Sequence, residues 1–529
     1  MISYLTENRP LVAAFAGRSP ARGVRRGAPI ADRVFRAAPR LAEFLRPAEI
    51  VAVKGPLDRP ISGLAIDSRR AAPGSVFFAL PGRRTDGAQF IDEAISRGAV
   101  AVVSRQLPLF PPAGVTFVRV ADPRAVQGAV AQRFYRNPDR DLAVIGVTGT
   151  AGKTTVAHVL KHLLEAEERV GLLGTICYDL GARTVPALRT TPEALDTFGL
   201  LAQMRGAGCH EAIVEVSSQG LEQRRVRGLQ FAAAIFTNLA PDHLDAHGTL
   251  ESYAAIKARL FTGDGACPPK ISIVNADDPY GRRLAALLTA GGATRVVTYG
   301  EHPTAAVRLE KIILGARRTA GRLVWPGGSA IVDSPLTGGA GVGNTLAALA
   351  TAWALGRDLA ACASRLRSFT GVAGRMERID AGQPFEVVVD YAHTEVALRR
   401  ALGELRAITR GRVLAVFGCG GHGDRSQRPR MTRAAQEGAD FTFATADNPR
   451  REGLARIFDD MRPGVIAADR IAWIEGRRRA IELAFRAAAP GDCVLIAGKG
   501  HESCQELADT IVPFDDRHVA RELLRERVR

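Results

Sequence analysis

The chain is poor in lysine, and no apolar run in it is long enough to span a bilayer. Its seven cysteines include no C-x-x-C pair, so we expect neither a disulfide framework nor a zinc site, and this cysteine usage favours a reducing compartment. The first residues contain no apolar segment of the kind that a secretory signal needs. These absences predict a cytoplasmic protein that does not insert into a membrane.

The basic charge of the chain is not accompanied by a nucleic-acid signature. The net charge is +16, from 71 basic and 55 acidic residues, and nearly all of the basic residues are arginines scattered along the sequence. No basic stripe with interleaved aromatic residues is present. We therefore expect no nucleic-acid partner, and the excess charge suits small anionic substrates.

The length of 529 residues predicts about three domains. Residues 1–46 form an arginine-rich extension that we expect to be disordered, and residues 47–138 read as a small α/β domain. From 139 to 370 short apolar runs alternate with helical patterns, which predicts a mostly parallel sheet, and 371–529 read as a third α/β unit. Strands are expected at 76–80, 99–103, 212–216, 233–237, 271–274, 385–389, 413–417, 441–444 and 493–497.

The most informative stretch is a glycine-rich turn at 148–155, between an apolar run and a helical pattern. It reads T-G-T-x-G-K-T-T, with Val147 where the usual phosphate-loop pattern has its first glycine. Such a loop points backbone N–H groups and a helix N-terminus at one place, which suits a phosphate. Lys153 would reach the outer phosphates, and the Thr154 hydroxyl would bind Mg²⁺. The alternative is an ordinary glycine-rich connection between a strand and a helix.

Acidic residues follow two of the expected strands in the same domain. Glu215 ends one of them, where a carboxylate could bind Mg²⁺ directly or through water, or could be a solvated strand end. The run 237–247 holds two acids and two histidines, Asp242, His243, Asp245 and His247. It indicates a second Mg²⁺ site, a group that orients phosphate, or a polar surface turn.

The scarcity of lysine makes the places that keep it informative. Lys153, Lys257 and Lys499 all lie in motif-like contexts, where arginine does not replace a primary amine. Lys257 lies in the helical pattern 253–261, and a lone lysine on a helix is either solvated or functional.

Two polar segments of the last domain carry opposite charges. Asp447–Arg450 and Gly498–Glu502 each follow an expected strand. An arginine can grip a carboxylate and a glutamate can bind an ammonium, so together they could hold a zwitterionic amino acid. Two turns stabilised by an exposed ion pair are the alternative.

Taken together, these motifs resemble the Mur ligases, ATP-dependent amide-bond formers of peptidoglycan synthesis, and among them the MurE type, which adds the third residue of the stem peptide. The resemblance extends from about residue 61 to 516. It implies a three-domain α/β architecture with a central P-loop ATPase domain and a C-terminal Rossmann-like domain. The motifs are Asp67–Arg69, Thr148–Thr155, Thr190–Pro192, Glu215–Ser218, Thr237–Gly248, Gly374–Glu377, Asp390–Thr394, Asp447–Arg450 and Gly498–Glu502.

The resemblance also implies a role for each domain and for individual residues. Residues 47–138 would bind UDP-MurNAc, 139–370 ATP, and 371–529 the incoming amino acid. ATP would be held by Thr148, Gly149, Thr150, Ala151, Gly152, Lys153, Thr154, Arg375 and Asp390. The muramoyl dipeptide nucleotide would be held by Ser68, Arg83, Arg84, Thr85, Thr190, Thr191, Ser217, Gln223 and Arg225. The incoming amino acid would be bound by Asp447, Asn448, Pro449, Arg450, Gly498 and Glu502. Mg²⁺ would be bound by Thr154, Glu215, His243 and Lys257, the last as a carbamate formed with CO₂.

The implied reaction adds meso-diaminopimelate to UDP-MurNAc-L-Ala-D-Glu through an acyl phosphate, with Lys153, Glu215, His243 and Lys257 in catalysis and the chain acting as a monomer. Gly423 stands where the resemblance would place an arginine for the diamino acid. A diverged ligase for another amino acid or carboxylate therefore remains an alternative, as does a non-catalytic scaffold.

Overall fold

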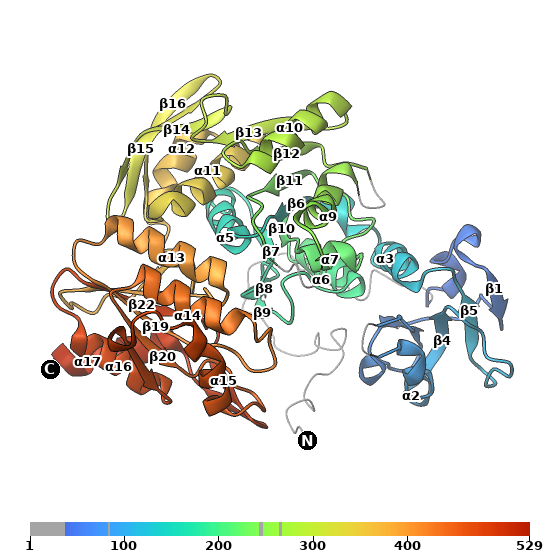
Figure 1. Ribbon diagram of the computed structural model, residues 1–529. Coiled ribbons are helices and arrows are strands. Elements are labelled where there is room, and N and C mark those ends of the chain that lie inside the picture. Colours follow the sequence, from blue (N-terminus) through green and yellow to red (C-terminus); the bar gives the residue numbers. More distant parts are fainter. Residues whose placement is uncertain (1–37, 83–84, 243–246, 264–266, 529) are drawn as a thin grey trace, which may run out of the picture.

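The computed structural model describes residues 38–82, 85–242, 247–263 and 267–528. Figure 1 shows a first domain at the right, a central domain, and a third domain at the lower left. The first domain has a five-stranded sheet in the order β1-β5-β4-β3-β2. Its elements are β1 (Ala52–Lys54), β2 (Gly63–Ala65), β3 (Ser75–Phe78), α2 (Ile91–Ser96), β4 (Ala99–Ser104), β5 (Thr116–Arg119) and α3 (Pro123–Phe134).

The central domain is built on an eleven-stranded sheet in the order β16-β15-β14-β13-β12-β11-β6-β10-β7-β8-β9. Neighbouring strands from β14 to β7 pair in parallel, and both ends of the sheet continue with antiparallel pairs. The strands are β6 (Ala143–Thr148), β7 (Val170–Leu173), β8 (Cys177–Asp179), β9 (Thr184–Pro186), β10 (Glu211–Glu215), β11 (Ala233–Phe236), β12 (Ile271–Asn275), β13 (Arg295–Gly300), β14 (Val307–Leu314), β15 (Thr319–Trp325) and β16 (Gly328–Ser334). The helices are α4 (Pro138–Asp141), α5 (Lys153–Leu164), α6 (Ala194–Gly206), α7 (Ser218–Glu222), α9 (Leu250–Thr262), α10 (Pro279–Gly291), α11 (Gly338–Ala354) and α12 (Leu359–Arg365).

Helices cover both faces of the central sheet because its parallel strands are apolar on both sides. Strand β6 alternates between the two cores: Ile145 packs with Leu160 of α5 and Leu346 of α11, whereas Val144 packs with Phe198 of α6. Continuous burial of this kind is typical of parallel strands. The loop after β6 therefore follows a strand that is buried on both faces of the sheet.

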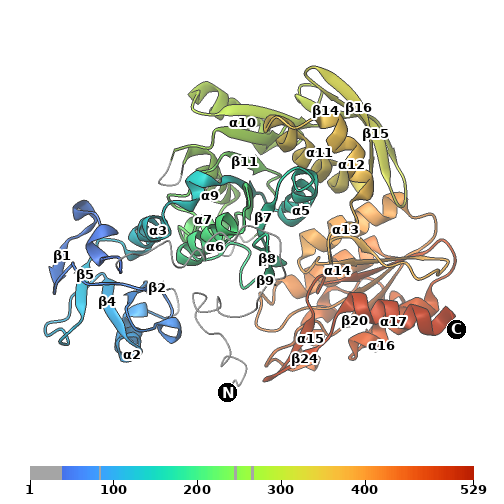
Figure 2. The same ribbon diagram turned by 180° about the vertical axis from the view of Figure 1, so that it is seen from behind.

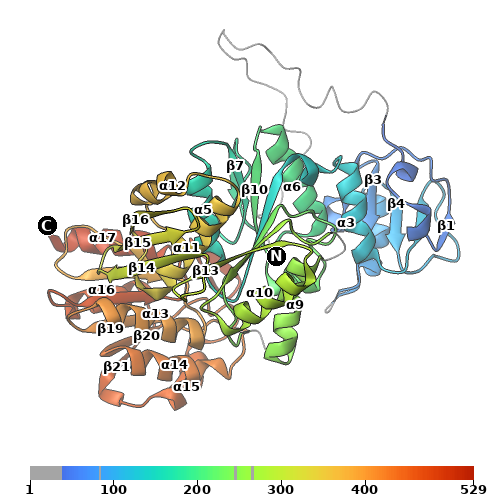
Figure 3. The same ribbon diagram turned by 90° about the horizontal axis from the view of Figure 1, so that it is seen from above.

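The third domain has a six-stranded sheet in the order β17-β18-β22-β19-β20-β21 and a separate two-stranded sheet, β23-β24. Figure 2 and Figure 3 show it beside the antiparallel end of the central sheet. Arg317, between β14 and β15, pairs there with Asp380 and Glu386 at 2.9 and 3.1 Å. The elements of the third domain are β17 (Glu377–Arg378), β18 (Glu386–Asp390), α13 (Glu395–Ile408), β19 (Val413–Phe417), α14 (Gln427–Gly438), β20 (Phe441–Thr445), α15 (Leu454–Met461), β21 (Ile471–Ile474), α16 (Arg477–Ala487), β22 (Cys493–Ala497), β23 (Cys504–Leu507), β24 (Thr510–Pro513) and α17 (Asp516–Val528).

The strands expected from the sequence are all present, with ends within two residues of the prediction. The expected N-terminal extension needs a correction. Leu41, Phe44 and Leu45 lie within it but are buried in a core with strands of the first domain, and the Phe44 ring lies 5.4 Å from that of Phe134. This part of the segment therefore belongs to the first domain. Among the helices that the structure describes, none is long and apolar enough to cross a membrane.

Candidate active site

The glycine-rich turn joins β6 to α5 and has the backbone that only glycine adopts without strain. Gly149 and Gly152 have φ of +148° and +88°. A Cβ on Gly149 would lie 1.9 Å from Thr237 Oγ1, so the end of β11 is packed against the loop. Asn238 also binds Ala151, accepting from its N–H at 3.0 Å and donating to its carbonyl at 3.1 Å. Two strand ends thus fix a loop of the shape that receives phosphate.

Two lysines from different helices converge on this loop. Lys153 Nζ, at the start of α5, donates to the carbonyl oxygens of Gly149 and Thr150 at 2.9 and 3.1 Å. Lys257 Nζ, from α9, donates to the Gly149 carbonyl at 2.9 Å and lies 4.2 Å from the centre of the Tyr253 ring. Lys257 is 1% exposed, although a lone helical lysine is usually solvated.

The surroundings of the two lysines favour a neutral amine on Lys257. Burial, with the charge of Lys153 in second place, holds the pKa of Lys257 well below its ordinary value, and Asp242 opposes this shift. Burial also lowers the pKa of Lys153, and there Glu215 and Asp242 both oppose it. A neutral primary amine is the nucleophile that CO₂ requires, so the environment fits the carbamate that the resemblance implies.

Glu215, at the end of β10, is the centre of a buried oxygen cluster beside the loop. It is 0% exposed and accepts from Thr154 Oγ1 at 2.8 Å. Thr175, just after β7, donates to it from its hydroxyl at 2.9 Å and from its backbone N–H at 3.0 Å. The Thr175 hydroxyl also lies 3.1 Å from that of Thr190. A carboxylate and hydroxyls are the hard oxygen ligands that Mg²⁺ prefers, so this donor set fits the metal.

Four residues expected to position the dipeptide lie together behind Glu215. Thr191 Oγ1 donates to the Glu215 carbonyl at 2.8 Å and accepts from the Ser217 N–H at 3.0 Å. The buried guanidinium of Arg225 donates to the Thr191 carbonyl at 3.0 Å and to Gln223 Oε1 at 2.6 Å. It also pairs with Glu193, which the sequence analysis missed, at 3.1 Å.

The residues expected to hold the nucleotide in the first domain are only partly described. Arg83 and Arg84 lie outside the described residues, as does His243. Thr85 is exposed, and the Ser68 hydroxyl donates to Glu93 at 2.7 Å. Arg70, in the same turn as Ser68, pairs with Asp196 of α6 at 3.0 Å, so this turn faces the central domain.

Arg375 lies just before β17 and Asp390 ends the neighbouring strand β18, both in the third domain. The Arg375 guanidinium lies 4.4 Å from the centre of the Tyr391 ring, and Asp390 accepts from the Met376 N–H at 2.8 Å. Burial raises the pKa of Asp390. The positive charge of Arg375 contributes to the lowered pKa of Lys153, which places the two cations within electrostatic reach.

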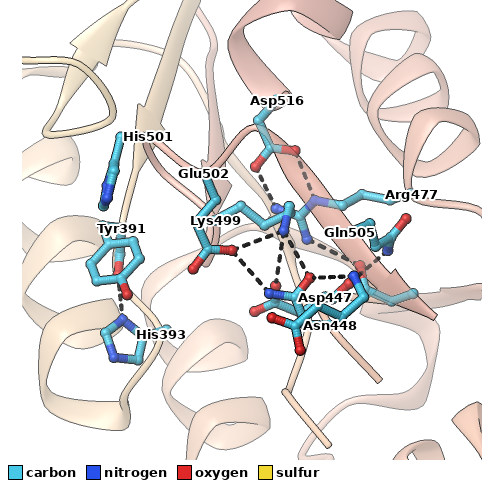
Figure 4. A network of polar contacts seen from close by, with 12 residues as sticks. Tyr391, His393, Asp447, Asn448, Arg477, Lys499, His501, Glu502, Gln505 and Asp516 are labelled. Atoms are coloured by element: carbon cyan, nitrogen blue, oxygen red, sulfur yellow. Dashed lines mark hydrogen bonds and ion pairs between the residues drawn. The ribbon is translucent and has the colours of Figure 1, made fainter. Parts of the chain in front are cut away.

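The segments 447–450 and 498–502 meet at the strand ends of the third domain, as Figure 4 shows. Lys499 Nζ donates to Asn448 Oδ1 and to Glu502 Oε2, both at 2.9 Å. Gly498 has φ of +117°, and a Cβ on it would lie 2.9 Å from Asp447 Oδ2. Pro449 follows Asn448, and Arg450 donates to Glu506 and to the Gly421 carbonyl, each at 2.8 Å.

The position of Gly423 is open, since the nearest atom to a Cβ there would be the Gly420 oxygen at 4.0 Å. Arg425 lies two residues further on, and Asp460 holds it bidentately at 2.7 and 2.6 Å. Its guanidinium therefore already has a carboxylate partner within the protein.

The sequence analysis assigned no role to Thr175 beside Glu215, to Tyr391 beside Arg375, or to Arg477 near Asp447. Thr175 had a usable signal, because it follows a buried apolar run at the same edge of the sheet as Glu215. Arg477 begins α16 and reaches the site only through the packing of that helix.

Comparison with known proteins agrees with this arrangement. Family profiles match residues 60–135 as the Mur ligase catalytic domain, 147–352 as the Mur ligase middle domain and 374–500 as the Mur ligase glutamate ligase domain. The chain is 44% identical over 471 residues to a UDP-N-acetylmuramoyl-L-alanyl-D-glutamate–2,6-diaminopimelate ligase of Gloeobacter violaceus, covering 89% of this chain and 95% of the relative. It is 42% identical to the enzyme of that name in Solibacter usitatus, covering 88% and 94%.

Solved structures lead to the same family. A structure with the same ligase name is 33% identical, has a TM-score of 0.65 and covers 93% of this chain and all of that one. A MurF structure from Acinetobacter baumannii, at 19% identity and a TM-score of 0.61, covers 83% of this chain and 91% of its own and shares the fold. The chain belongs to the Mur ligase family of ATP-dependent amide ligases.

Proposed function

We propose that this chain joins meso-diaminopimelate to the terminal carboxylate of UDP-MurNAc-L-Ala-D-Glu, with ATP as the energy source, in peptidoglycan precursor synthesis. The names of the relatives at 42–44% identity support the substrates. The observation that carries the proposal is the convergence of Lys153, the buried Lys257 and the Thr154–Glu215 pair on one phosphate loop. A scaffold without activity has no use for a buried amine and a buried carboxylate placed in this way.

ATP binds at the loop of residues 148–154 in this proposal. The backbone N–H groups of the loop and the N-terminus of α5 face the phosphates. Lys153 exchanges its present bonds to the Gly149 and Thr150 carbonyls for bonds to the outer phosphates. Arg375 closes over the phosphates from the third domain, and Asp390 accepts from the ribose hydroxyls.

The Thr154 hydroxyl and the Glu215 carboxylate would hold Mg²⁺, and the Lys257 carbamate and His243 would be further ligands. Carbamylation converts a neutral amine into an anionic oxygen donor, a change that a guanidinium cannot undergo. Mg²⁺ bound there would neutralise charge on the phosphate oxygens during transfer. Thr175 keeps Glu215 oriented through its two hydrogen bonds.

The nucleotide substrate spans the first and central domains. Ser68, Arg83, Arg84 and Thr85 hold its uridine end. The muramoyl dipeptide is positioned by Thr190, Thr191, Ser217, Gln223 and Arg225. The internal bonds from Thr191 and Arg225 hold this group against the backbone of Glu215, which brings the terminal carboxylate close to the γ-phosphate.

The reaction then has two displacements. A carboxylate oxygen of the dipeptide attacks the γ-phosphorus of ATP, ADP leaves, and an acyl phosphate forms. Lys153, Arg375 and the loop N–H groups stabilise the charge on the transferring phosphoryl group. A neutral amine of the diamino acid attacks the acyl carbon, inorganic phosphate leaves, and the amine loses a proton. The products are the amide, ADP and phosphate.

The third domain presents the diamino acid. Asn448, Arg450 and Glu502 contact its charged groups, and Asp447, Pro449 and Gly498 shape the loops around them. The open position of Gly423 and the pairing of Arg425 with Asp460 favour one alternative. In that alternative the chain is a Mur-type ligase for an amino acid whose distal end needs no second arginine.

Phosphate release from ATP tests both possibilities. The purified chain is assayed with Mg²⁺, bicarbonate, UDP-MurNAc-L-Ala-D-Glu and either meso-diaminopimelate or L-lysine. Release that needs both the nucleotide and meso-diaminopimelate supports the proposal, whereas release with L-lysine alone as the amine supports the alternative. If neither amine accelerates release, the proposed function is wrong.

A further inference from the structure

The amino-acid site of the third domain rests on a buried lysine that contacts no solvent. Lys499 is 0% exposed and follows β22 in the turn that leads to β23. Its ammonium donates to Asn448 Oδ1 and Glu502 Oε2, each at 2.9 Å, and lies 4.0 Å from Asp447 Oδ1 (Figure 4). Two carboxylates therefore share one cation at this point.

A second ion pair lies nearby, but it does not supply a further positive charge for Asp447 and Glu502. Arg477 and Asp516 are both 0% exposed and pair bidentately at 2.8 and 2.7 Å. The Arg477 guanidinium also donates to the backbone carbonyls of Ala446 and Ala497. Arg477 also acts on Asp447, but its charge is balanced by Asp516, so the Arg477–Asp516 pair adds no net charge to the group of Lys499, Asp447 and Glu502.

The cluster of Lys499, Asp447 and Glu502 is therefore short of one positive charge. A buried charge without a partner is costly, so such a cluster favours a cation from outside. Burial raises the pKa of Asp447, while the charges of Arg477 and Lys499 lower it.

Glu502 marks where that cation enters. Its side chain is 30% exposed, unlike those of Lys499 and Arg477. Its bonds to Lys499 and to Asn448 Nδ2, both at 2.9 Å, go to the same oxygen, Oε2. Among the described residues, the other oxygen, Oε1, accepts no hydrogen bond, so it is the oxygen available to a ligand.

We infer that Lys499 is a positioning residue that determines specificity for a diamino acid. By holding Oε2 it turns Oε1 of Glu502 toward the substrate, and its single charge leaves the cluster able to accept one ammonium. That ammonium belongs to the amine of the substrate that is not acylated. The inference rests on the proposed function, since it concerns the amine of the incoming amino acid.

Lysine suits this position better than arginine for a physical reason. The ammonium is a compact point charge that fits between two carboxylates and one amide oxygen, whereas a guanidinium is planar and larger. The position is fully buried, so a larger group has no space to extend into solvent.

Steady-state kinetics with paired substrates tests the inference. The variants are Lys499→Met, Glu502→Gln and the double variant, and the substrates are meso-diaminopimelate and 2-aminopimelate, which lacks the second amine. We expect Lys499→Met to raise the KM for meso-diaminopimelate about tenfold or more, because truncating one partner of a buried charge pair is costly. The KM values for ATP and the nucleotide substrate should stay unchanged, and the preference for meso-diaminopimelate over 2-aminopimelate should fall.

The double variant separates positioning from a general structural role. Because Lys499 acts through Glu502, the double variant should match Glu502→Gln within about threefold, so the two effects should not multiply. Arg478→Met is the matched control, since it removes one positive charge from the same domain at an exposed pair with Glu522. Effects that multiply, or an unchanged substrate preference in Lys499→Met, would overturn the inference.

Two further measurements keep the test decisive. Acyl-phosphate formation from ATP and the nucleotide substrate needs no amine, so it reports whether a variant is folded and its central domain intact. If Lys499→Met does not fold, Lys499→Gln, which keeps a hydrogen-bond donor without the charge, replaces it in every comparison. If the unaltered chain does not use meso-diaminopimelate, the proposed function fails; if it does and the Lys499 variants keep its preference, only this inference fails.

Discussion

Lys153 and Lys257 donate to the same acceptor, the carbonyl oxygen of Gly149, and each lies 2.9 Å from it. Two ammonium groups this close in a buried place would repel each other strongly. The repulsion is relieved when one of them is neutral, and Lys257 is the one whose pKa is held well below its ordinary value. We therefore expect Lys257 to be the neutral member of this pair of lysines.

Replacing Lys257 by arginine should abolish the reaction while the positive charge is kept. A guanidinium stays protonated and cannot form a carbamate, so we expect phosphate release to fall about 100-fold or more, the loss typical of one stabilising group in an active site. Lys270→Arg is the control, because Lys270 is exposed on the same domain. A carbamate signal in ¹³C NMR with labelled bicarbonate should appear in the unaltered chain and vanish in Lys257→Arg. Full activity of Lys257→Arg would contradict the carbamate role.

The lowered pKa of Lys257 also predicts how stability depends on pH. In the unfolded chain the amine has its ordinary pKa of 10.5, whereas in the folded chain it stays neutral to a much lower pH. As pH falls below 10.5 the unfolded state takes up a proton that the folded state does not, so the folded state loses stability. Denaturation in CO₂-free buffer should show Lys257→Met gaining stability over the unaltered chain as pH falls from 10.5, with no further gain below the folded pKa. A difference that is independent of pH would mean that Lys257 is charged in the folded protein.

Gly149 should tolerate no side chain. Its φ of +148° is strained for other residues, and a Cβ would lie 1.9 Å from Thr237 Oγ1. We expect Gly149→Ala to lose about 1–3 kcal/mol of stability through backbone strain and to lose ATP binding as the loop shifts. Gly403→Ala, at an open position within α13, is the control and should be neutral or slightly stabilising. Calorimetric titration with ATP and thermal unfolding check both variants.

The sequence predicted the glycine-rich loop between β6 and α5, because the loop is one continuous stretch whose glycines and lysine stand at fixed spacing. It also pointed to Lys257 and Lys499, since a chain that prefers arginine has a reason to keep these amines. The burial of Lys257 was not predictable, because it depends on how α9 packs against the loop after β6.

The features that the sequence did not predict depend on contacts between segments that are distant in the chain. The apolar run before Thr175 places it at the same edge of the sheet as Glu215, but its contact with Glu215 depends on β7 lying next to β10, and the order of the strands is not encoded locally. The antiparallel ends of the central sheet, β8–β9 and β15–β16, were not predicted because short alternating runs beside a parallel sheet resemble loops. The predicted boundary at residue 46 lies too far along the chain. Leu41 and Phe44 already pack in the core of the first domain, but the arginines around them hid this in the sequence.

Glu215 should be needed for its charge and not only for its hydrogen bonds. Glu215→Gln keeps one oxygen that can accept from the Thr154 and Thr175 hydroxyls, but it loses the acceptor for the Thr175 N–H and removes the anionic oxygen offered to Mg²⁺. We expect phosphate release to fall about 100-fold and the Mg²⁺ concentration needed for half-maximal rate to rise. Glu251→Gln, exposed in the first turn of α9, is the control. An unchanged Mg²⁺ dependence would remove Glu215 from the metal site.

The buried pair of Arg477 and Asp516 should set the stability of the third domain. Removing one partner of a fully buried pair leaves the other charge uncompensated, which costs about 3–5 kcal/mol. Arg477→Met should therefore lower the free energy of unfolding by that amount, and it should also leave the Ala446 and Ala497 carbonyls without their donor. Arg478→Met, one residue on, loses only exposed pairs with Glu522 and Glu526 and should change stability by less than about 1 kcal/mol. Denaturant unfolding of the two variants measures the difference, and equal losses would show that the burial of the Arg477 pair has no energetic weight.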